Sequence, residues 1–231
     1  MRETIRSFRI ANILLLFANL VFLVCYDIFG GLWLKGFTSF WFVPLGVTNL
    51  IFARVRGIAD LGTLRWILAG LILGMLADVL LGLVFLLGVV SFALGHVCYL
   101  AAFFRLEKLC PRDLLCALPW TLVALFLCFC TPVITIEDPM MRKFLFVYGI
   151  ILGAMVGKST SNYLSSKTPF RLVLLIGSIL FWFSDLMLGI DMFGRSSRLT
   201  WILCSYNYWP AQAITAHSLY HLVMEKARET R

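Results

Sequence analysis

The segment between Gly70 and Tyr99 is apolar almost throughout, yet it contains one carboxylic acid, Asp78, and one imidazole, His96. A membrane-spanning helix needs about 20 mostly apolar residues. The segment is therefore long enough for a hairpin of two spans, with its turn predicted near Gly88. A charged side chain inside a span costs about 2.5–3.5 kcal/mol on insertion scales. Asp78 is for that reason a candidate functional residue.

The rest of the chain has the same character. Hydrophobic residues make up 61% of the 231 residues and charged residues 14%, whereas soluble domains are about half apolar and a quarter charged. We expect one all-α, polytopic transmembrane domain over residues 1–231. Its eight transmembrane helices are predicted at residues 8–29, 36–53, 63–87, 89–104, 114–133, 140–157, 168–190 and 199–222.

The basic residues indicate an orientation. Alternating spans place 15 of the 20 Lys and Arg residues on the side of the two termini, Lys158 among them, and leave the other side Lys35, Arg142, Lys143, Arg195 and Arg198. Cytoplasmic loops of membrane proteins are enriched in basic residues. Both termini are thus predicted to be cytoplasmic, in a bacterial inner membrane or the endoplasmic reticulum. The same bias explains the net charge of +8 without a nucleic-acid partner.

Two acids stand apart from the other ten, which are predicted to lie at span ends or in loops. Asp78 and Asp185 fall well inside the third and seventh spans, and the sequences that follow them are alike, Asp-Val-Leu-Leu-Gly-Leu and Asp-Leu-Met-Leu-Gly-Ile. The two helices are an even number of crossings apart and run in the same direction. This pattern is typical of a four-plus-four parallel internal repeat.

Other polar residues are predicted at a similar depth. A rise of about 1.5 Å per residue puts His96, Tyr208 and Gln212 in the half of the membrane away from the termini, with Lys35 at its mouth. Helical spacing adds Tyr99 to the face of His96.

Several motifs are incomplete. Gly157-Lys158-Ser159-Thr160 resembles the end of a phosphate-binding loop, but the first glycine of that motif is replaced by Leu152. His217 and His221 have the spacing of a metal pair, although the deep acids lie toward the other side, so we expect no metal site. The chain has neither a Gly-x-Ser-x-Gly serine hydrolase elbow nor the Gly-x-Gly-Asp of intramembrane aspartyl peptidases.

Four segments taken together resemble the YhhN-like membrane family. They are Gly-Met-Leu-Ala-Asp78, Phe92-Ala-Leu-Gly-His96-Val-Cys-Tyr99, Leu-Phe-Trp-Phe-Ser184-Asp185 and Tyr208-Trp-Pro-Ala-Gln212. They occur in the family's order and cover nearly the whole chain. Ala77 and Asn207 depart from the usual glycine and threonine, and Lys35-Gly36 replaces a lysine-proline pair.

The resemblance implies a lysoplasmalogenase, which cleaves the vinyl ether bond of a lysoplasmalogen to a fatty aldehyde and glycerophospho-ethanolamine or -choline. It implies catalytic roles for Asp78 and Asp185. Vinyl ether hydrolysis needs a neutral carboxylic acid and a carboxylate, as glycoside cleavage does, so we expect no cofactor. Mutual repulsion in a low-dielectric pocket would let the two acids share one proton. Substrate, water or cation binding is assigned to His96, Tyr99, Ser184, Tyr208, Gln212 and Lys35.

Two alternatives stay open. Paired intramembrane acids on duplicated helices also occur in proton-coupled transporters of small molecules or lipids. Against a transporter, the sequence predicts no broken helix apart from a kink at Pro210. The acids could also only hold helices together. Lysophospholipid and membrane lipid are the expected partners, and the oligomeric state is not predicted.

Overall fold

The computed structural model describes residues 2–229, and within them all regular structure is helical. Met1, Thr230 and Arg231 of the predicted domain lie outside the described residues. The helices are α1 (Arg2–Phe29), α2 (Leu32–Phe40), α3 (Phe42–Val55), α4 (Gly62–Leu83), α5 (Phe85–Leu106), α6 (Pro111–Phe129), α7 (Pro139–Ser165), α8 (Pro169–Phe193) and α9 (Arg198–Glu229).

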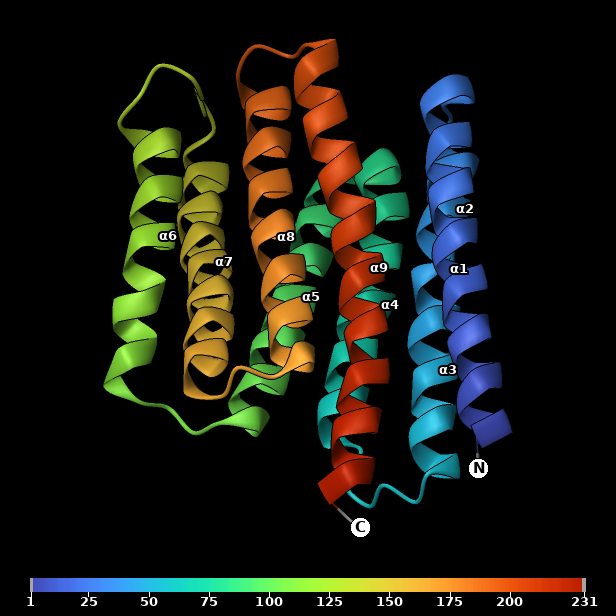
Figure 1. Cartoon of the computed structure of the whole chain (residues 1–231). Coiled ribbons are helices and arrows are strands. Elements are labelled where there is room, and N and C mark those ends of the chain that lie inside the picture. Colours follow the sequence, from blue (N-terminus) through green and yellow to red (C-terminus); the bar gives the residue numbers. More distant parts are fainter. Residues whose placement is uncertain (1, 230–231) are drawn as a thin grey trace.

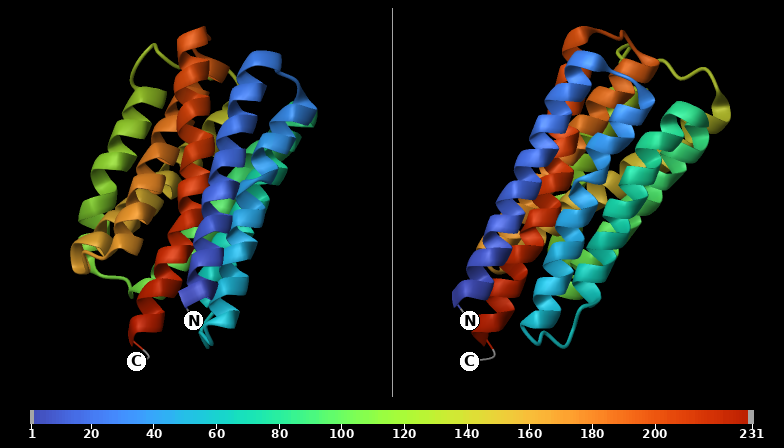
Figure 2. Two further views of the ribbon diagram at one scale, coloured as in Figure 1. Left: turned by 45° about the vertical axis from the view of Figure 1, so that its right-hand side comes forward. Right: turned by 90° about the vertical axis from the view of Figure 1, so that its right-hand side faces the viewer.

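Seven helical segments in the described part of the chain are long and apolar enough to cross a membrane, with Leu32–Val55 counted as one. The eighth crossing is α9, which is more polar and runs the length of the bundle beside the others (Figure 1). The all-α polytopic prediction is confirmed. The first and last described residues lie at the same end of the bundle in every view (Figures 1 and 2).

Neighbouring helices pack as antiparallel pairs. The most extensive contacts join α4 to α5, α8 to α9 and α6 to α7. In the last pair, Gly153 and Gly157 of α7 face Thr121 and Ala117 of α6 so closely that a Cβ on either glycine would overlap the α6 backbone. Small residues of this kind let membrane helices approach one another. Helices α4 and α8, which carry the two deep acids, run in the same direction (Figure 1), as an internal repeat requires, and the repeat itself stays a prediction.

The turn between α4 and α5 was predicted at the wrong residue. The chain reverses at Val84, whose φ of −141° and ψ of 94° are extended, and Gly88 belongs to the first turns of α5. A Cβ on Gly88 would lie 2.5 Å from the backbone nitrogen of Leu81. This glycine therefore allows close packing of α5 on α4 and does not form the turn.

The second span has a kink that was not predicted. Helix α2 ends at Phe40 and α3 begins at Phe42, and Trp41 between them keeps helical φ and ψ of −66° and −24°. Pro44 lacks the amide hydrogen that would bond the Phe40 carbonyl, and its ring clashes with that carbonyl in a regular helix. Conversely, α9 continues through Pro210. Leu32–Val55 is still one helical span, kinked and not unwound.

Lys158 was assigned to a cytoplasmic loop and Asp113 to a solvated position. Both expectations are wrong, because α7 extends to Ser165 and buries Lys158 at 1% exposure. The Lys158 ammonium donates to Oδ2 of Asp113 at 2.8 Å and to the Lys108 carbonyl at 3.0 Å. Residues Gly157–Thr160 are helical, which agrees with the rejection of a phosphate-binding loop.

Candidate active site

A cavity of about 380 Å³ opens among the helices at the end of the bundle away from the termini. Asp78 of α4 and Asp185 of α8 both line it, together with Lys35 of α2 and Tyr208 of α9. The aspartate side chains are 3% and 6% exposed. Two acids far apart in the sequence thus reach one largely buried space, in the half of the bundle predicted for them.

Three donors surround Asp78. The Ser39 hydroxyl donates to Oδ2 at 2.5 Å and the Tyr208 hydroxyl at 2.6 Å. The Lys35 ammonium lies 3.6 Å from Oδ1, and its side chain is 21% exposed. Hydrogen bonds from charged and neutral donors together stabilise a carboxylate. Two hydroxyl groups and one ammonium group contact this buried carboxyl group.

Helix α2 supplies two of these donors. Lys35 and Ser39 are four residues apart and so share one face of the helix, and Ser39 is fully buried. The indole of Trp209 on α9 donates to the Ser39 oxygen at 2.9 Å, which orients the Ser39 hydroxyl toward Asp78. The short helix α2 therefore forms one wall of the site.

A second chain of hydrogen bonds reaches Asp78 from α5 and α9. Tyr99 donates to Oε1 of Gln212 at 2.5 Å, and the Gln212 amide lies 3.5 Å from the Tyr208 hydroxyl. Tyr208 in turn donates to Asp78. Gly70 and Gly74 of α4 make room for this chain, because a Cβ would lie 2.4 Å from the Tyr99 ring and 2.5 Å from the Gln212 amide nitrogen, respectively.

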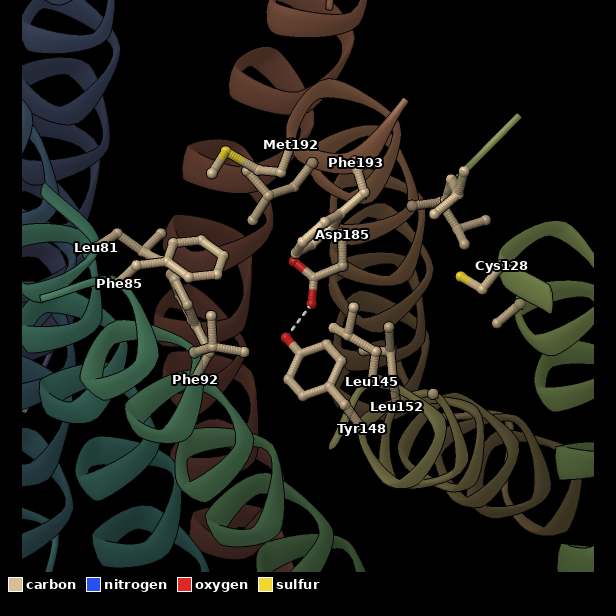
Figure 3. Close-up of a pocket in the computed structure, with 17 residues that line it drawn as sticks. Leu81, Phe85, Phe92, Cys128, Leu145, Tyr148, Leu152, Asp185, Met192 and Phe193 are labelled. Carbon is tan, nitrogen blue, oxygen red and sulfur yellow. Dashed lines mark hydrogen bonds between the residues drawn. The ribbon is translucent and has the colours of Figure 1, made fainter. Parts of the chain in front are cut away.

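Asp185 has a separate set of partners. The Tyr148 hydroxyl of α7 donates to Oδ2 of Asp185, and Nε2 of His96 lies 3.2 Å from the same oxygen and 2.9 Å from the Tyr148 hydroxyl. Figure 3 shows the second Asp185 oxygen turned away from Tyr148. Among the described residues, Nδ1 of His96 is buried without a partner, so a proton there would have no acceptor. A hydrogen on Nε2 would face the oxygens of both Asp185 and Tyr148.

The prediction of one proton shared directly between the two acids does not fit this arrangement. The structure gives no hydrogen bond between Asp78 and Asp185 among its described side chains, and each accepts from its own donors. The two carboxyl groups therefore differ in their hydrogen-bond partners.

The remaining predicted site residues divide into two groups. Lys35, His96 and Tyr208 contact an aspartate directly, and Gln212 and Tyr99 connect to Asp78 through Tyr208. Ser184 does not, because its buried hydroxyl donates to the Phe181 carbonyl of its own helix at 2.7 Å. It is placed beside Asp185 in the sequence but does not line the cavity.

Ser39, Trp209 and Tyr148 were not predicted. Ser39 follows Thr38 in an aromatic-rich segment, and Trp209 follows Tyr208 directly. Tyr148 is a lone polar side chain in an otherwise apolar stretch of its span, and that isolation was the one signal available for it.

The histidine pair lies elsewhere. Nδ1 of His217 is 3.0 Å from Oδ1 of Asn12, and the residues that the structure describes contain no group of three His, Cys, Asp or Glu side chains suited to hold a metal ion. His217 therefore joins α9 to α1.

A family model described as the YhhN family matches residues 38–219. The matched region includes both aspartates, His96, Tyr208 and Gln212, whereas Lys35 precedes it. No curated protein and no solved structure matches the chain.

Proposed function

Because the chain belongs to the YhhN family, we propose that this integral membrane protein is a lysoplasmalogenase. It would hydrolyse the vinyl ether bond of a lysoplasmalogen to a fatty aldehyde and a glycerophospho-ethanolamine or -choline. The observation that carries the proposal is that Asp78 and Asp185, both buried, line one cavity and have different donors. Acid-catalysed cleavage through a cation uses one acid and one carboxylate in this way.

The proposed reaction begins with transfer of a proton from a carboxylic acid to the β-carbon of the vinyl ether. The resulting oxocarbenium ion is captured by water, which loses a proton to a carboxylate and gives a hemiacetal. Collapse of the hemiacetal breaks the carbon–oxygen bond to glycerol and releases the aldehyde. During this collapse the carboxyl group that took the proton from water gives it to the glycerol oxygen, and the first acid, now a carboxylate, takes the proton of the hemiacetal hydroxyl. One water molecule is consumed, and both groups return to their starting protonation states.

We assign the proton donor to Asp185 and the carboxylate to Asp78. Asp78 accepts from two hydroxyl groups and lies beside the Lys35 ammonium, surroundings that stabilise negative charge. The hydrogen bonds to Asp185 reach only Oδ2, which leaves Oδ1 available to carry a proton. The Asp78 carboxylate would then stabilise the cation and accept the proton of the attacking water.

Lys35 is the proposed contact for the phosphate of the head group, because it lines the cavity and its side chain is 21% exposed. Tyr99, Tyr208 and Gln212 would orient Asp78 through their hydrogen-bond chain. We also propose that the end of the bundle with both termini faces the cytoplasm, from the excess of basic residues there.

The test is hydrolysis of lysoplasmenyl-ethanolamine by purified protein in D₂O. Protonation at carbon predicts a fatty aldehyde with one deuterium at the carbon next to the carbonyl, detected by mass spectrometry after immediate trapping. Release of aldehyde without that deuterium would contradict the protonation step. Absence of aldehyde would contradict the lysoplasmalogenase proposal as a whole.

A proton-coupled transporter is the second candidate, and the two acids that line one cavity inside the bundle favour it. Ionisable side chains within membrane-spanning helices also form the proton relays of transporters. Protein reconstituted into vesicles distinguishes the two. A transporter moves the intact lysophospholipid together with protons, whereas the enzyme produces aldehyde without a proton gradient.

A further inference from the structure

A second cavity lies beside the cavity of about 380 Å³ that Lys35 and Asp78 line, which we call the polar cavity. Asp185 lines both. The second cavity contains about 70 Å³ of free space, well above the roughly 10–15 Å³ that a cavity needs to admit one small group. Its walls come from α4, α5, α6, α7 and α8 and from the loop before α7. The residues that line it without lining the polar cavity include Val89, Cys128, Leu145, Gly149, Leu152 and Gly189. We call these six residues and the space they surround the chain pocket (Figure 3).

The walls of the chain pocket are almost entirely hydrocarbon. Apart from the weakly polar thiol of Cys128, the polar side chains that line it are Tyr148 and Asp185, which are bonded to each other. Ile134 covers one side from the loop between α6 and α7, and the Thr135 amide fixes this loop by donating to the Phe193 carbonyl at 2.8 Å. The pocket thus offers apolar contacts and no ion-binding group other than Asp185.

The two cavities adjoin along a shared wall. Leu81, Phe85, Phe92, Leu188 and Met192 line both, as does Asp185. One side of this boundary therefore presents Lys35 and Asp78, and the other presents hydrocarbon. An amphiphilic molecule fits such a boundary with its head on the first side and its chain on the second.

We propose that the chain pocket binds the first carbons of the substrate's alkenyl chain while the polar cavity holds the head group. This inference rests on the proposed function. In a lysoplasmalogen the vinyl ether joins the polar glycerol to the hydrocarbon chain, so the bond that breaks lies where polarity changes. Asp185 lies at that boundary of the protein, and seating the chain in the pocket brings the vinyl carbon to the proton donor.

Gly189 offers a way to fill the pocket from α8. A Cβ at this position would meet only the Cδ1 of Ile134, at 3.4 Å, which is an ordinary contact. Gly189→Phe therefore adds a ring to the pocket without a backbone clash. Cys128→Phe fills it from α6 and serves if the first variant does not fold. Val123→Phe adds the same bulk to the outer face of α6, where Val123 is 46% exposed, and is the matched control.

The measurement is kcat/KM for 1-alkenyl lysophospholipids with chains from two to sixteen carbons, in nanodiscs. In the unmodified protein each methylene that enters the pocket raises kcat/KM about fourfold, until the pocket is full. Gly189→Phe loses that gain, falling at least tenfold on long chains and less than twofold on the two-carbon vinyl chain, which adds no methylene to the pocket. An unchanged chain-length profile in a folded Gly189→Phe or Cys128→Phe protein would overturn the proposal, as would the same loss in Val123→Phe.

A binding measurement separates this inference from the reaction. Saturated 1-alkyl ether lysophospholipids lack the vinyl bond and are expected to raise the melting temperature more as their chains lengthen. If the unmodified protein releases no aldehyde but Gly189→Phe abolishes this dependence on chain length, the reaction is wrong and the chain pocket stands. If aldehyde is released and the dependence survives in Gly189→Phe, the pocket is wrong and the reaction stands.

Discussion

The Tyr148 hydroxyl of α7 donates a hydrogen bond to Oδ2 of Asp185 on α8. The same hydroxyl lies 2.9 Å from Nε2 of His96 on α5, so three helices meet at one oxygen atom. Tyr148 is the side chain that fixes how Asp185 faces the cavity.

Tyr148→Phe removes this hydrogen bond and keeps the ring. A hydrogen bond between neutral groups contributes about 0.5–1.5 kcal/mol, so we expect kcat to fall about two- to tenfold, with little change in KM because the head-group contacts remain. Steady-state kinetics on lysoplasmenyl-ethanolamine measures both. Tyr206→Phe is the control, since the Tyr206 hydroxyl bonds Asp27 at the surface. Equal activity of Tyr148→Phe and the unmodified protein would show that Asp185 needs no such support.

The ion pair between Lys158 and Asp113 is predicted to hold α6 to α7. Lys158→Met leaves a buried carboxylate without its cation, which costs about 3–5 kcal/mol, and should lower the melting temperature markedly. Replacing both residues, as Lys158→Met with Asp113→Leu, should restore most of the loss. The exposed pair of Arg105 and Asp60 is the comparison, because Arg105→Gln should cost no more than about 1 kcal/mol. A thermal shift no larger than that of Arg105→Gln would contradict a structural role.

Gly74 is predicted to serve the site more than the packing of α4. In Gly74→Ala the new methyl group would displace the Gln212 amide, which it would approach to 2.5 Å. The amide can move, so we expect the fold to survive and activity to fall severalfold as the bonds to Tyr208 and Tyr99 weaken. Val123→Ala, at a 46% exposed position on the outer face of α6, should keep full activity. Activity and melting temperature measured together distinguish a change in the site from a loss of stability. Unaltered turnover in Gly74→Ala would exclude a role for the hydrogen-bond chain of Tyr99, Gln212 and Tyr208.

The crossings could be predicted from the sequence because each needs a long apolar segment. The chain's departures from that rule depend on local chemistry. Pro44 kinks the second span, whereas α9 continues through Pro210. The presence of a proline in the sequence does not by itself predict which of these two outcomes occurs. Lys158 was predicted to lie in a loop because the sequence does not show that a buried carboxylate, Asp113, pairs with it inside the bundle.

The candidate site was predictable where its residues are unusual in a membrane. Asp78, Asp185 and His96 cost free energy in a bilayer and so stand out. Ser39 and Tyr148 do not, because a hydroxyl inside a span is common, and only the packing of α2 and α7 brings these two beside the acids. Ser184 was predicted to belong to the site because it precedes Asp185 in the sequence. Its hydroxyl instead donates to a carbonyl of its own helix.

The central claim is that Asp78 and Asp185 together cleave a vinyl ether bond. The direct test is aldehyde release from lysoplasmenyl-ethanolamine by Asp78→Asn and Asp185→Asn, with Asp60→Asn, a 59% exposed side chain, as the control. Loss of general acid–base catalysis predicts a decrease of about 10²–10⁴-fold in either variant, an unchanged control, and melting temperatures that confirm folding. Appreciable turnover by either folded variant would contradict the account.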